Sequence, residues 1–133
     1  MIKIGVIACG KQKLARVARA DELYTGRYFK ACQAYILASG VVDYRILSAK
    51  YGLVKPNALL APYELLVTDL NPADKLAWVS AAQKALRELR CDTIVSLLGK
   101  KYRPALDGIE TPIEEPLRVA GLSTLTMAYH MEF

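Results

Sequence analysis

The sequence contains few residues that bind metals or form disulfides, and it has no long apolar run. Its 133 residues include only three cysteines, with no CxxC pair, and one histidine. This argues against a structural zinc site and a disulfide framework, and an odd cysteine count fits a reducing compartment. No apolar run reaches the roughly 18 residues of a membrane span, and the N-terminal sequence lacks the pattern of a signal peptide. We therefore expect a cytoplasmic protein with no membrane segment, metal or cofactor.

Internal repeats, low-complexity segments and linkers are also missing from the chain. With 53% hydrophobic and 23% charged residues, the sequence has the composition of an ordinary globular domain. Its length is sufficient for one hydrophobic core. We expect a single α/β domain over residues 1–133, on the following pattern of strands and helices.

Three continuous apolar runs predict strands buried on both faces of a sheet, at residues 2–8, 42–48 and 93–98. Helical patterns separate these strands, one at residues 23–39 and one that begins at the pair Asn71-Pro72, which suits an N-cap and a first helical position. This alternation predicts a three-layer α/β fold with a mainly parallel central sheet and helices on both faces.

Other segments carry weaker signals. The connection over residues 49–70 is long and broken by prolines, and we expect at most one helical turn in it, at residues 57–60. Residues 109–113 are a weak strand candidate, and residues 123–127 predict either a last strand or the start of a helix. The core stripe expected on the second helix consists of Leu76, Val79, Ala82, Leu86 and Leu89.

The net charge of +5 is concentrated after the three predicted strands. The carboxyl ends of parallel strands meet at one edge of a sheet, where α/β proteins place their sites. We therefore expect three basic loops to converge there and to suit nucleic acid or nucleotide phosphate. The alternative is that each cluster is a solvated loop. The clusters are Lys11, Lys13, Arg16 and Arg19; Lys50 and Lys55; and Lys100, Lys101 and Arg103.

The loop after the second strand has the strongest functional pattern. Ser48 ends the strand, Lys50 supplies a cation with three donors, and Tyr51 can stack or donate a hydrogen bond. Such a group suits a nucleobase or a phosphate. The alternative is a packing turn in which Tyr51 covers the edge of the core.

The loop after the first strand provides a second candidate group. Lys13 is a candidate anion ligand. Cys9 is a candidate nucleophile beside basic residues, or a small buried cysteine at the strand end. Tyr24 shares a helix face with Arg27 and Tyr28, an arrangement that can stack a base but that is also common in cores.

An acidic residue follows a proline in the long connection. Pro62 stiffens the loop that carries Tyr63 and Glu64. A glutamate in a cleft can act as a general base, or stabilise the positive charge that develops on a sugar when its N-glycosidic bond breaks. The alternatives for Glu64 are a surface ion pair and replacement in this role by Asp69. The third basic loop adds Gly99, Lys100 and Tyr102 as candidate phosphate contacts.

Four spaced motifs resemble those of DUF6884, a family of small bacterial and phage proteins. Cys9-Gly10-Lys11-Gln12-Lys13 is similar to its CSKxK element, and residues 20–29 resemble the helix start that follows it. Residues 47–54 with Pro62-Tyr63-Glu64 resemble its LSAKYGLL…PYD signature, and residues 98–106 its GxxYxxxL element. The chain departs from the family in having Glu64 where aspartate is usual, and in its sequence after residue 122.

Two further resemblances are more distant. The signature after the second strand is similar to that of the YaaA family of peroxide-stress proteins, which are described as DNA-binding. The cysteine- and lysine-containing loop resembles the core domain of archaeosine synthase, a tRNA-modifying enzyme. This second resemblance implies a uracil-DNA-glycosylase-like α/β fold that acts on nucleic acid.

These observations predict a nucleic-acid- or nucleotide-directed enzyme, with Glu64 as the catalytic residue of N-glycosidic bond hydrolysis. One alternative is a DNA-binding stress or defence protein that uses the same basic edge without turnover. Another is a small-molecule transferase that uses nucleotides. The predicted substrate-binding residues are Cys9, Lys13, Tyr24, Ser48, Lys50, Tyr51, Tyr63, Gly99, Lys100 and Tyr102.

Overall fold

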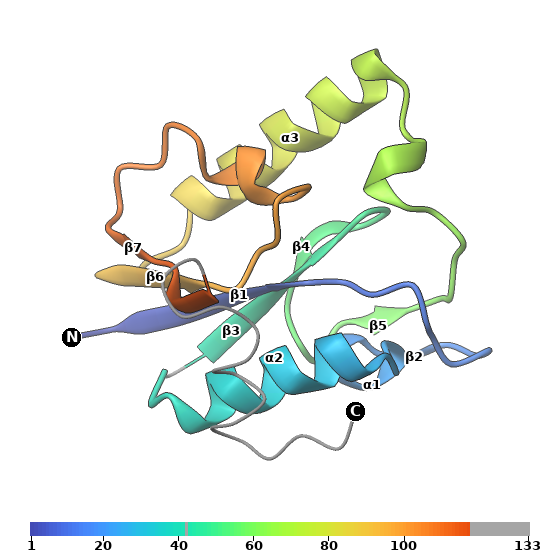
Figure 1. The fold of residues 1–133 in the computed structure, drawn as a ribbon, viewed down its shortest axis with the longest axis horizontal. Coiled ribbons are helices and arrows are strands. Elements are labelled where there is room, and N and C mark those ends of the chain that lie inside the picture. Colours follow the sequence, from blue (N-terminus) through green and yellow to red (C-terminus); the bar gives the residue numbers. More distant parts are fainter. Residues whose placement is uncertain (42, 118–133) are drawn as a thin grey trace.

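A computed structural model, which describes residues 1–41 and 43–117, shows a five-stranded sheet between two helical layers (Figure 1). The strand order is β4-β3-β1-β6-β7. The central strand β1 (Lys3–Ala8) pairs in parallel with β3 (Asp43–Ser48) on one side and with β6 (Thr93–Ser96) on the other. The predicted α/β fold with a mainly parallel sheet is therefore confirmed.

The two outer strands are short. β7 (Ile113–Glu114) pairs in parallel with β6 and shares only Ile113 with the weak strand candidate at residues 109–113, so the rest of that candidate is wrong. β4 (Gly52–Val54) is antiparallel to β3, because the chain turns back through a tight hairpin. The candidate element at residues 123–127 lies outside the described residues. None of the described helices is long and apolar enough to cross a membrane.

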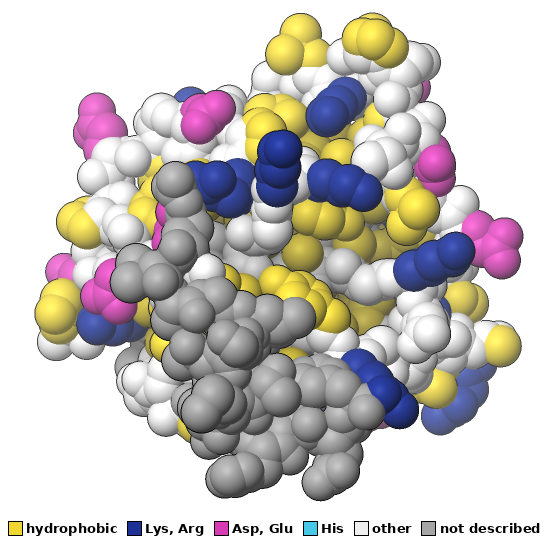
Figure 2. Space-filling model, viewed as in Figure 1, with side chains coloured by type: hydrophobic (Ala, Val, Ile, Leu, Met, Phe, Trp, Pro, Cys, Tyr) yellow, Lys and Arg dark blue, Asp and Glu magenta, His cyan; other side chains and the backbone are white. Residues whose placement is uncertain are grey.

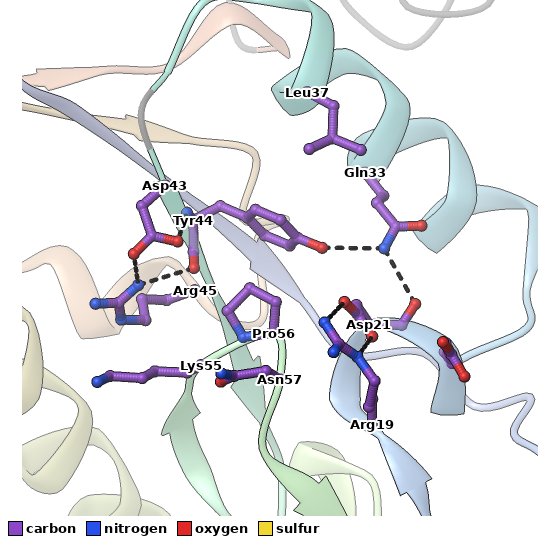
Figure 3. Close-up of a pocket in the computed structure, with 11 residues that line it drawn as sticks. Arg19, Asp21, Gln33, Leu37, Asp43, Tyr44, Arg45, Lys55, Pro56 and Asn57 are labelled. Carbon is purple, nitrogen blue, oxygen red and sulfur yellow. Dashed lines mark hydrogen bonds and ion pairs between the residues drawn. The ribbon is translucent and has the colours of Figure 1, made fainter.

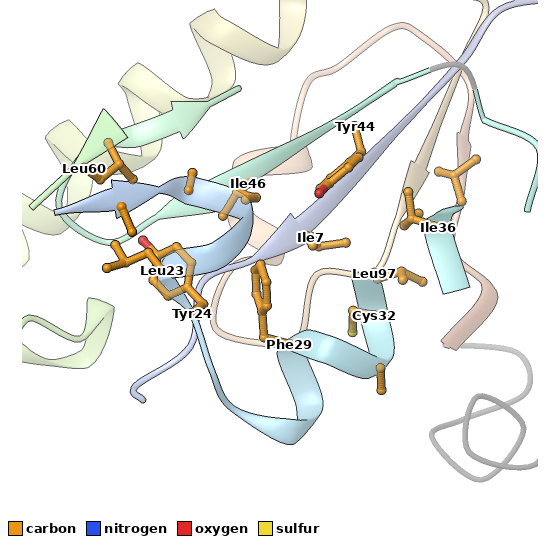
Figure 4. Close-up of a cluster of buried hydrophobic side chains, with 14 residues drawn as sticks. Ile7, Leu23, Tyr24, Phe29, Cys32, Ile36, Tyr44, Ile46, Leu60 and Leu97 are labelled. Atoms are coloured by element: carbon orange, nitrogen blue, oxygen red, sulfur yellow. The ribbon is translucent and has the colours of Figure 1, made fainter. Parts of the chain in front are cut away.

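Alternating side chains of the central strands fill a core on each face of the sheet. Ile7 of β1 packs with Phe29 and Ile36 of α2 (Arg27–Ala38) on one face (Figure 4). Val6, its neighbour in β1, packs on the other face with Leu86 of α3 (Pro72–Arg87). This alternation explains why the strands read as continuous apolar runs, since both faces are covered.

α3 (Pro72–Arg87) begins where the sequence predicts, and the side-chain oxygen of Asn71 accepts a hydrogen bond from the Asp74 backbone N–H at 2.8 Å. Ala82 and Leu86 are buried as expected. The placement of Leu76 in the core stripe is wrong, since 69% of this residue is exposed. The first part of α3 extends past the sheet, so it has no apolar surface to cover (Figure 1).

The helix predicted at residues 23–39 is wrong in its first turn. α1 (Ala20–Leu23) ends before Tyr24, which is extended, with φ −86° and ψ 120°. Tyr24 forms an antiparallel bridge with Lys13. The flanking backbone is paired as well, since Thr25 N–H donates to the Gln12 carbonyl at 2.9 Å. Pairing with the loop after β1 thus replaces the helical turn, and it brings the two predicted site residues together.

The long connection contains short strands instead of the helical turn predicted at residues 57–60. β5 (Leu59–Leu60) pairs with β2 (Ala18–Arg19) in a separate antiparallel ribbon. A 3-10 turn, η1 (Val67–Asp69), follows, and a second one, η2 (Arg103–Leu106), lies after β6 and contacts α3. The connection therefore packs along the domain as an ordered segment.

Candidate functional site

The carboxyl ends of β1, β3 and β6 lie at one edge of the sheet because the three strands are parallel. The chain continues from β1 to β3 on one side and later returns to β6 on the other side. The order of the strands thus reverses next to β1, and loops that diverge at such a point form the usual ligand-binding crevice of open α/β sheets.

A hydroxyl network joins three elements at this edge. Tyr63 Oη lies 2.7 Å from Tyr24 Oη and 2.8 Å from Ser48 Oγ. Ser48 Oγ also accepts the backbone N–H groups of Lys50 and Tyr51, at 3.2 and 3.0 Å. Because Ser48 Oγ accepts two N–H groups, its hydroxyl hydrogen is available for Tyr63, and a further hydrogen bond joins the hydroxyls of Tyr63 and Tyr24. The network fixes the loop of Tyr63 against β3.

Burial keeps the tyrosines of this network neutral. It raises the pKa of Tyr24 to about 12, and it raises the pKa of Tyr63 as well. In the unfolded chain, the pKa of tyrosine is about 10. These residues are therefore hydrogen-bonding groups and not phenolate bases at neutral pH.

The raised tyrosine pKa values predict a loss of stability in alkaline solution. The stabilising contribution of neutral Tyr24 is complete below about pH 10 and is lost as the pH rises toward about 12, because the unfolded chain then releases a proton that the folded chain retains. Urea unfolding from neutral pH to about pH 11 measures this slope. Tyr24→Phe should show a smaller slope than the unmodified protein; an equal slope would contradict the assignment.

Lys13 lies over the ring faces of the same two tyrosines. Its Nζ is 4.3 Å from the centroid of the Tyr63 ring and 5.6 Å from that of Tyr24. Nζ donates a hydrogen bond to the Lys11 carbonyl at 3.1 Å. Burial lowers the pKa of Lys13, although the charges of Cys9 and Glu64 act in the opposite direction.

Cys9 and Tyr102 connect the loops after β1 and β6. The Cys9 Sγ lies 3.3 Å from Tyr102 Oη. The Tyr102 ring packs edge-on against Trp78 of α3, whose Nε1–H donates to the Ser48 carbonyl at 3.0 Å. Burial raises the pKa of Tyr102, which keeps its hydroxyl neutral. These contacts thus connect the loops that follow β1, β3 and β6.

Two pockets lie side by side at this edge, with volumes of about 270 and 170 Å³. They share Lys11 and Leu66, and we call them together the carboxyl-edge cleft. The larger pocket has two carboxylates and two lysines, and the smaller one is less polar. The larger is lined by Lys11, Lys13, Glu64, Leu65, Leu66 and Asp69, and the smaller by Cys9, Gly10, Lys11, Leu66, Val67, Thr68, Lys101 and Tyr102.

The structure brings most of the predicted site residues together. Glu64, Lys13, Cys9 and Tyr102 line the carboxyl-edge cleft. Tyr24, Ser48 and Tyr63 form the network behind Lys13. These seven residues therefore lie close together at the carboxyl edge of the sheet, and their chemical roles stay predictions.

Other predicted residues lie around the cleft without lining it. The Tyr51 hydroxyl donates to the Ala61 carbonyl at 3.1 Å, and its ring packs edge-on against Tyr63. Lys50 is exposed, with Nζ 5.3 Å from the centre of the Tyr51 ring. The Gly99 carbonyl accepts backbone hydrogen bonds of the turn that follows it, and Lys100 lines a separate pocket beside Arg103.

The sequence placed Lys101 in a basic cluster but did not single it out, and Thr68 and the apolar pair Leu65-Leu66 were not predicted as lining residues. Lys100 and Lys101 are adjacent, and nothing in the sequence distinguishes the lysine that faces the cleft.

Two of the basic residues expected at this edge lie elsewhere. Lys55 and Arg19 line a third pocket of about 750 Å³ near the start of β3 (Figure 3). Lys55 follows β4, which runs back along β3, so the hairpin carries it to the opposite end of the strands. Arg19 is paired with Asp21 at 2.9 Å, and Arg45 with Asp43 at 2.6 Å. The charges that line this pocket are thus largely balanced.

Figure 2 shows a different balance of charge over the middle of the face that it presents. Lys and Arg side chains predominate around a hollow below α3, whereas Asp and Glu side chains lie mainly near the outline. Among residues 1–41 and 43–117, no group of three or more His, Cys, Asp or Glu side chains is placed to hold a metal ion.

A comparison with protein-family models decides the relationship that the four motifs predicted. The model of a family of unknown function, DUF6884, matches residues 4–128. The chain belongs to the DUF6884 family. The comparison with curated proteins finds no match. The DUF6884 motifs after β1 and β3 are the segments that supply Cys9, Lys13, Ser48 and Tyr63 to the carboxyl-edge cleft and its supporting network.

Proposed function

We propose that this DUF6884 protein is an enzyme that binds a nucleotide, free or within a nucleic acid, in the carboxyl-edge cleft and hydrolyses its N-glycosidic bond. The observation that carries the proposal is the placement of Glu64 in one pocket with Asp69, Lys11 and Lys13, next to a second, less polar pocket lined by Tyr102. The two pockets offer what a nucleotide requires: cations for the phosphate, a carboxylate for the sugar and an aromatic, mainly apolar surface for the base.

The lysines supply the anion-binding part of the site. Lys11 lies between the two pockets, and Lys101 lines the smaller one. Ammonium groups on flexible stems act as point charges toward phosphate and tolerate several phosphate positions. Thr68, with one donor and two acceptor lone pairs, and Tyr102 can bind the edges of a base in the smaller pocket.

Glu64 supplies the chemistry in this proposal. Cleavage of an N-glycosidic bond leaves positive charge on the sugar ring, and a nearby carboxylate stabilises that charge and activates the attacking water. The neighbouring loop is held in place, since Asp69 accepts the Leu66 backbone N–H at 2.9 Å.

The distant resemblance to the archaeosine synthase core supports an enzyme that acts on nucleic acid. A uracil-DNA-glycosylase-like fold is part of this proposal. The resemblance to YaaA proteins instead favours DNA binding without turnover. Both alternatives use the basic carboxyl edge, so binding alone does not separate them. Release of free base does.

A thermal-shift screen with mononucleotides, nucleobases and short DNA and RNA, at two salt concentrations, tests the binding part of the proposal. We expect Lys101→Ala to weaken binding at least about tenfold, since one hydrogen bond to a charged group contributes about 1.5–3 kcal/mol. Lys55→Ala removes the same charge at the opposite end of the strands and should leave the affinity unchanged. Equal losses in both variants would place the ligand outside the cleft. A shift with polymers alone that disappears in salt would favour the DNA-binding alternative.

A further inference from the structure

We propose that Lys13 is an amine nucleophile that forms an imine with the C1 aldehyde of a pentose phosphate in the carboxyl-edge cleft. This inference rests on the proposed function, because hydrolysis of an N-glycosidic bond leaves the sugar with a hemiacetal at C1 that opens to an aldehyde. The pentose is either a free sugar phosphate or the abasic sugar of a nucleic acid, which present the same reactive group.

The backbone of Lys13 is held by its neighbours on both sides. Lys13 forms an antiparallel bridge with Tyr24. Leu14 N–H donates to the Leu23 carbonyl and Thr25 N–H to the Gln12 carbonyl, each at 2.9 Å. A lysine anchored in this way presents its side chain from a fixed point, which a catalytic amine requires.

The side chain of Lys13 is directed by the tyrosine–serine network. Its Nζ lies 4.3 Å from the centre of the Tyr63 ring, and the position of that ring is fixed by the hydroxyl contacts to Ser48 and Tyr24. Lys13 lines the same pocket as Glu64. The network thus acts as a platform that places the amine beside a carboxylate.

Lys13 has cation–π contacts with Tyr63 and Tyr24, which favour its charged form, but it lacks the carboxylate partner that usually pairs with a lysine. Within the described residues no carboxylate lies within salt-bridge distance of Lys13 Nζ, in contrast to Lys3, which pairs with Glu114 at 2.9 Å. Its hydrogen bond goes to the Lys11 backbone carbonyl. Burial lowers the pKa of Lys13 in spite of the charges of Cys9 and Glu64. A larger share of neutral, nucleophilic amine follows than for a surface lysine.

The step balances without an oxidant or reductant. The lone pair of Lys13 Nζ forms a bond to C1 while the carbonyl π electrons move to oxygen, and a proton passes from nitrogen to that oxygen. Protonation of the resulting hydroxyl, for which Glu64 and Asp69 of the same pocket are candidate shuttles, allows loss of water and leaves the C=N bond. Addition of water reverses the sequence and releases the sugar. Lys11 and Lys101 lie where they can hold the phosphate of the same pentose.

Borohydride trapping tests this inference. The full-length protein is incubated with ribose 5-phosphate, or with an oligonucleotide that carries one abasic site, in the presence of cyanoborohydride, which converts an imine to a stable secondary amine. Tandem mass spectrometry of peptides then localises the adduct, and it separates Lys13 from Lys11. The variants are Lys13→Arg, which keeps the charge, and Lys55→Ala, which removes a lysine outside the cleft. Thermal unfolding of each variant verifies that it folds.

We expect the adduct on Lys13 to exceed that on any other lysine at least about tenfold, and to be lost in Lys13→Arg but not in Lys55→Ala. Whichever sugar source gives the adduct identifies the natural form of the ligand. An adduct on Lys11, an even spread over surface lysines, or no adduct with either sugar would overturn the inference. Because peptide mapping uses the unmodified chain, this holds even if Lys13→Arg is unstable. Base release without an adduct would contradict the imine but remain consistent with the proposed glycosidic reaction. An adduct without base release would support the imine and contradict the glycosidic reaction.

Discussion

Glu64→Gln is expected to lower base release about 10²–10⁴-fold, the usual contribution of a positioned general acid or base. The substitution preserves size and hydrogen-bonding shape but removes the charge. Glutamine can neither activate water nor stabilise a cationic sugar. The substitution therefore removes stabilisation of the transition state and lowers the rate of the chemical step. The affinity for the nucleotide should change by less than about threefold. Turnover measured by chromatography of the released base, with affinity measured in parallel, separates the two effects.

The matched control for this experiment is Glu22→Gln. Glu22 is exposed like Glu64, but it lines the pocket near the start of β3. Turnover by Glu22→Gln should equal that of the unmodified protein. If Glu64→Gln retains full turnover, Glu64 is not the catalytic residue, and Asp69, which lines the same pocket, becomes the next carboxylate to test. If Glu64→Gln instead loses affinity and turnover equally, its role is binding.

Gly5→Val should destabilise the fold by about 3 kcal/mol or more, at the upper end of the usual range for an overfilled core. Gly5 is buried in the central strand, and a Cβ added there would lie 2.7 Å from Ile36 Cδ1 and 2.9 Å from Ile36 Cγ2 of α2. Both contacts are closer than carbon atoms approach. The absence of a side chain at Gly5 is what lets α2 pack directly on the sheet.

Urea unfolding measures this effect, with Gly99→Ala as control because nothing lies within 4 Å of a Cβ at that position. In the double variant Gly5→Val/Ile36→Ala, the smaller side chain in α2 leaves room for the valine. We therefore expect its destabilisation to be less than the sum of the two single effects. Additive effects would show that Gly5 and Ile36 do not compete for the same space.

The sequence predicted the strands of the sheet well, because buried parallel strands are continuous apolar runs whose limits are marked by polar residues. Local signals also placed the start of α3, where Asn71 and Pro72 have distinct roles. The signals failed where pairing over a distance decided the structure. The helical pattern through Tyr24 gave way to a bridge with Lys13, and the hairpin of β4 carried Lys55 away from the predicted basic edge.

The candidate site could be predicted in outline but not in its internal arrangement. Parallel strands imply that the loops of Cys9, Ser48 and Tyr102 meet, and the structure confirms that they do. The contact between Tyr24 and Tyr63 joins residues 39 positions apart through a 2.7 Å hydroxyl pair, and no local pattern specifies it. The same is true of the side chain of Lys13, whose environment depends on where Tyr63 is held.

The proposed glycosidic reaction is tested most directly by measuring the release of free base by the unmodified protein. The panel of substrates consists of nucleoside monophosphates and short DNA and RNA oligonucleotides. We expect at least one ligand that binds the carboxyl-edge cleft to release its free base, and we expect this release to be slower in Glu64→Gln. Binding at the cleft with no base released from any member of the panel would contradict the glycosidic reaction and leave the cleft as a binding site alone.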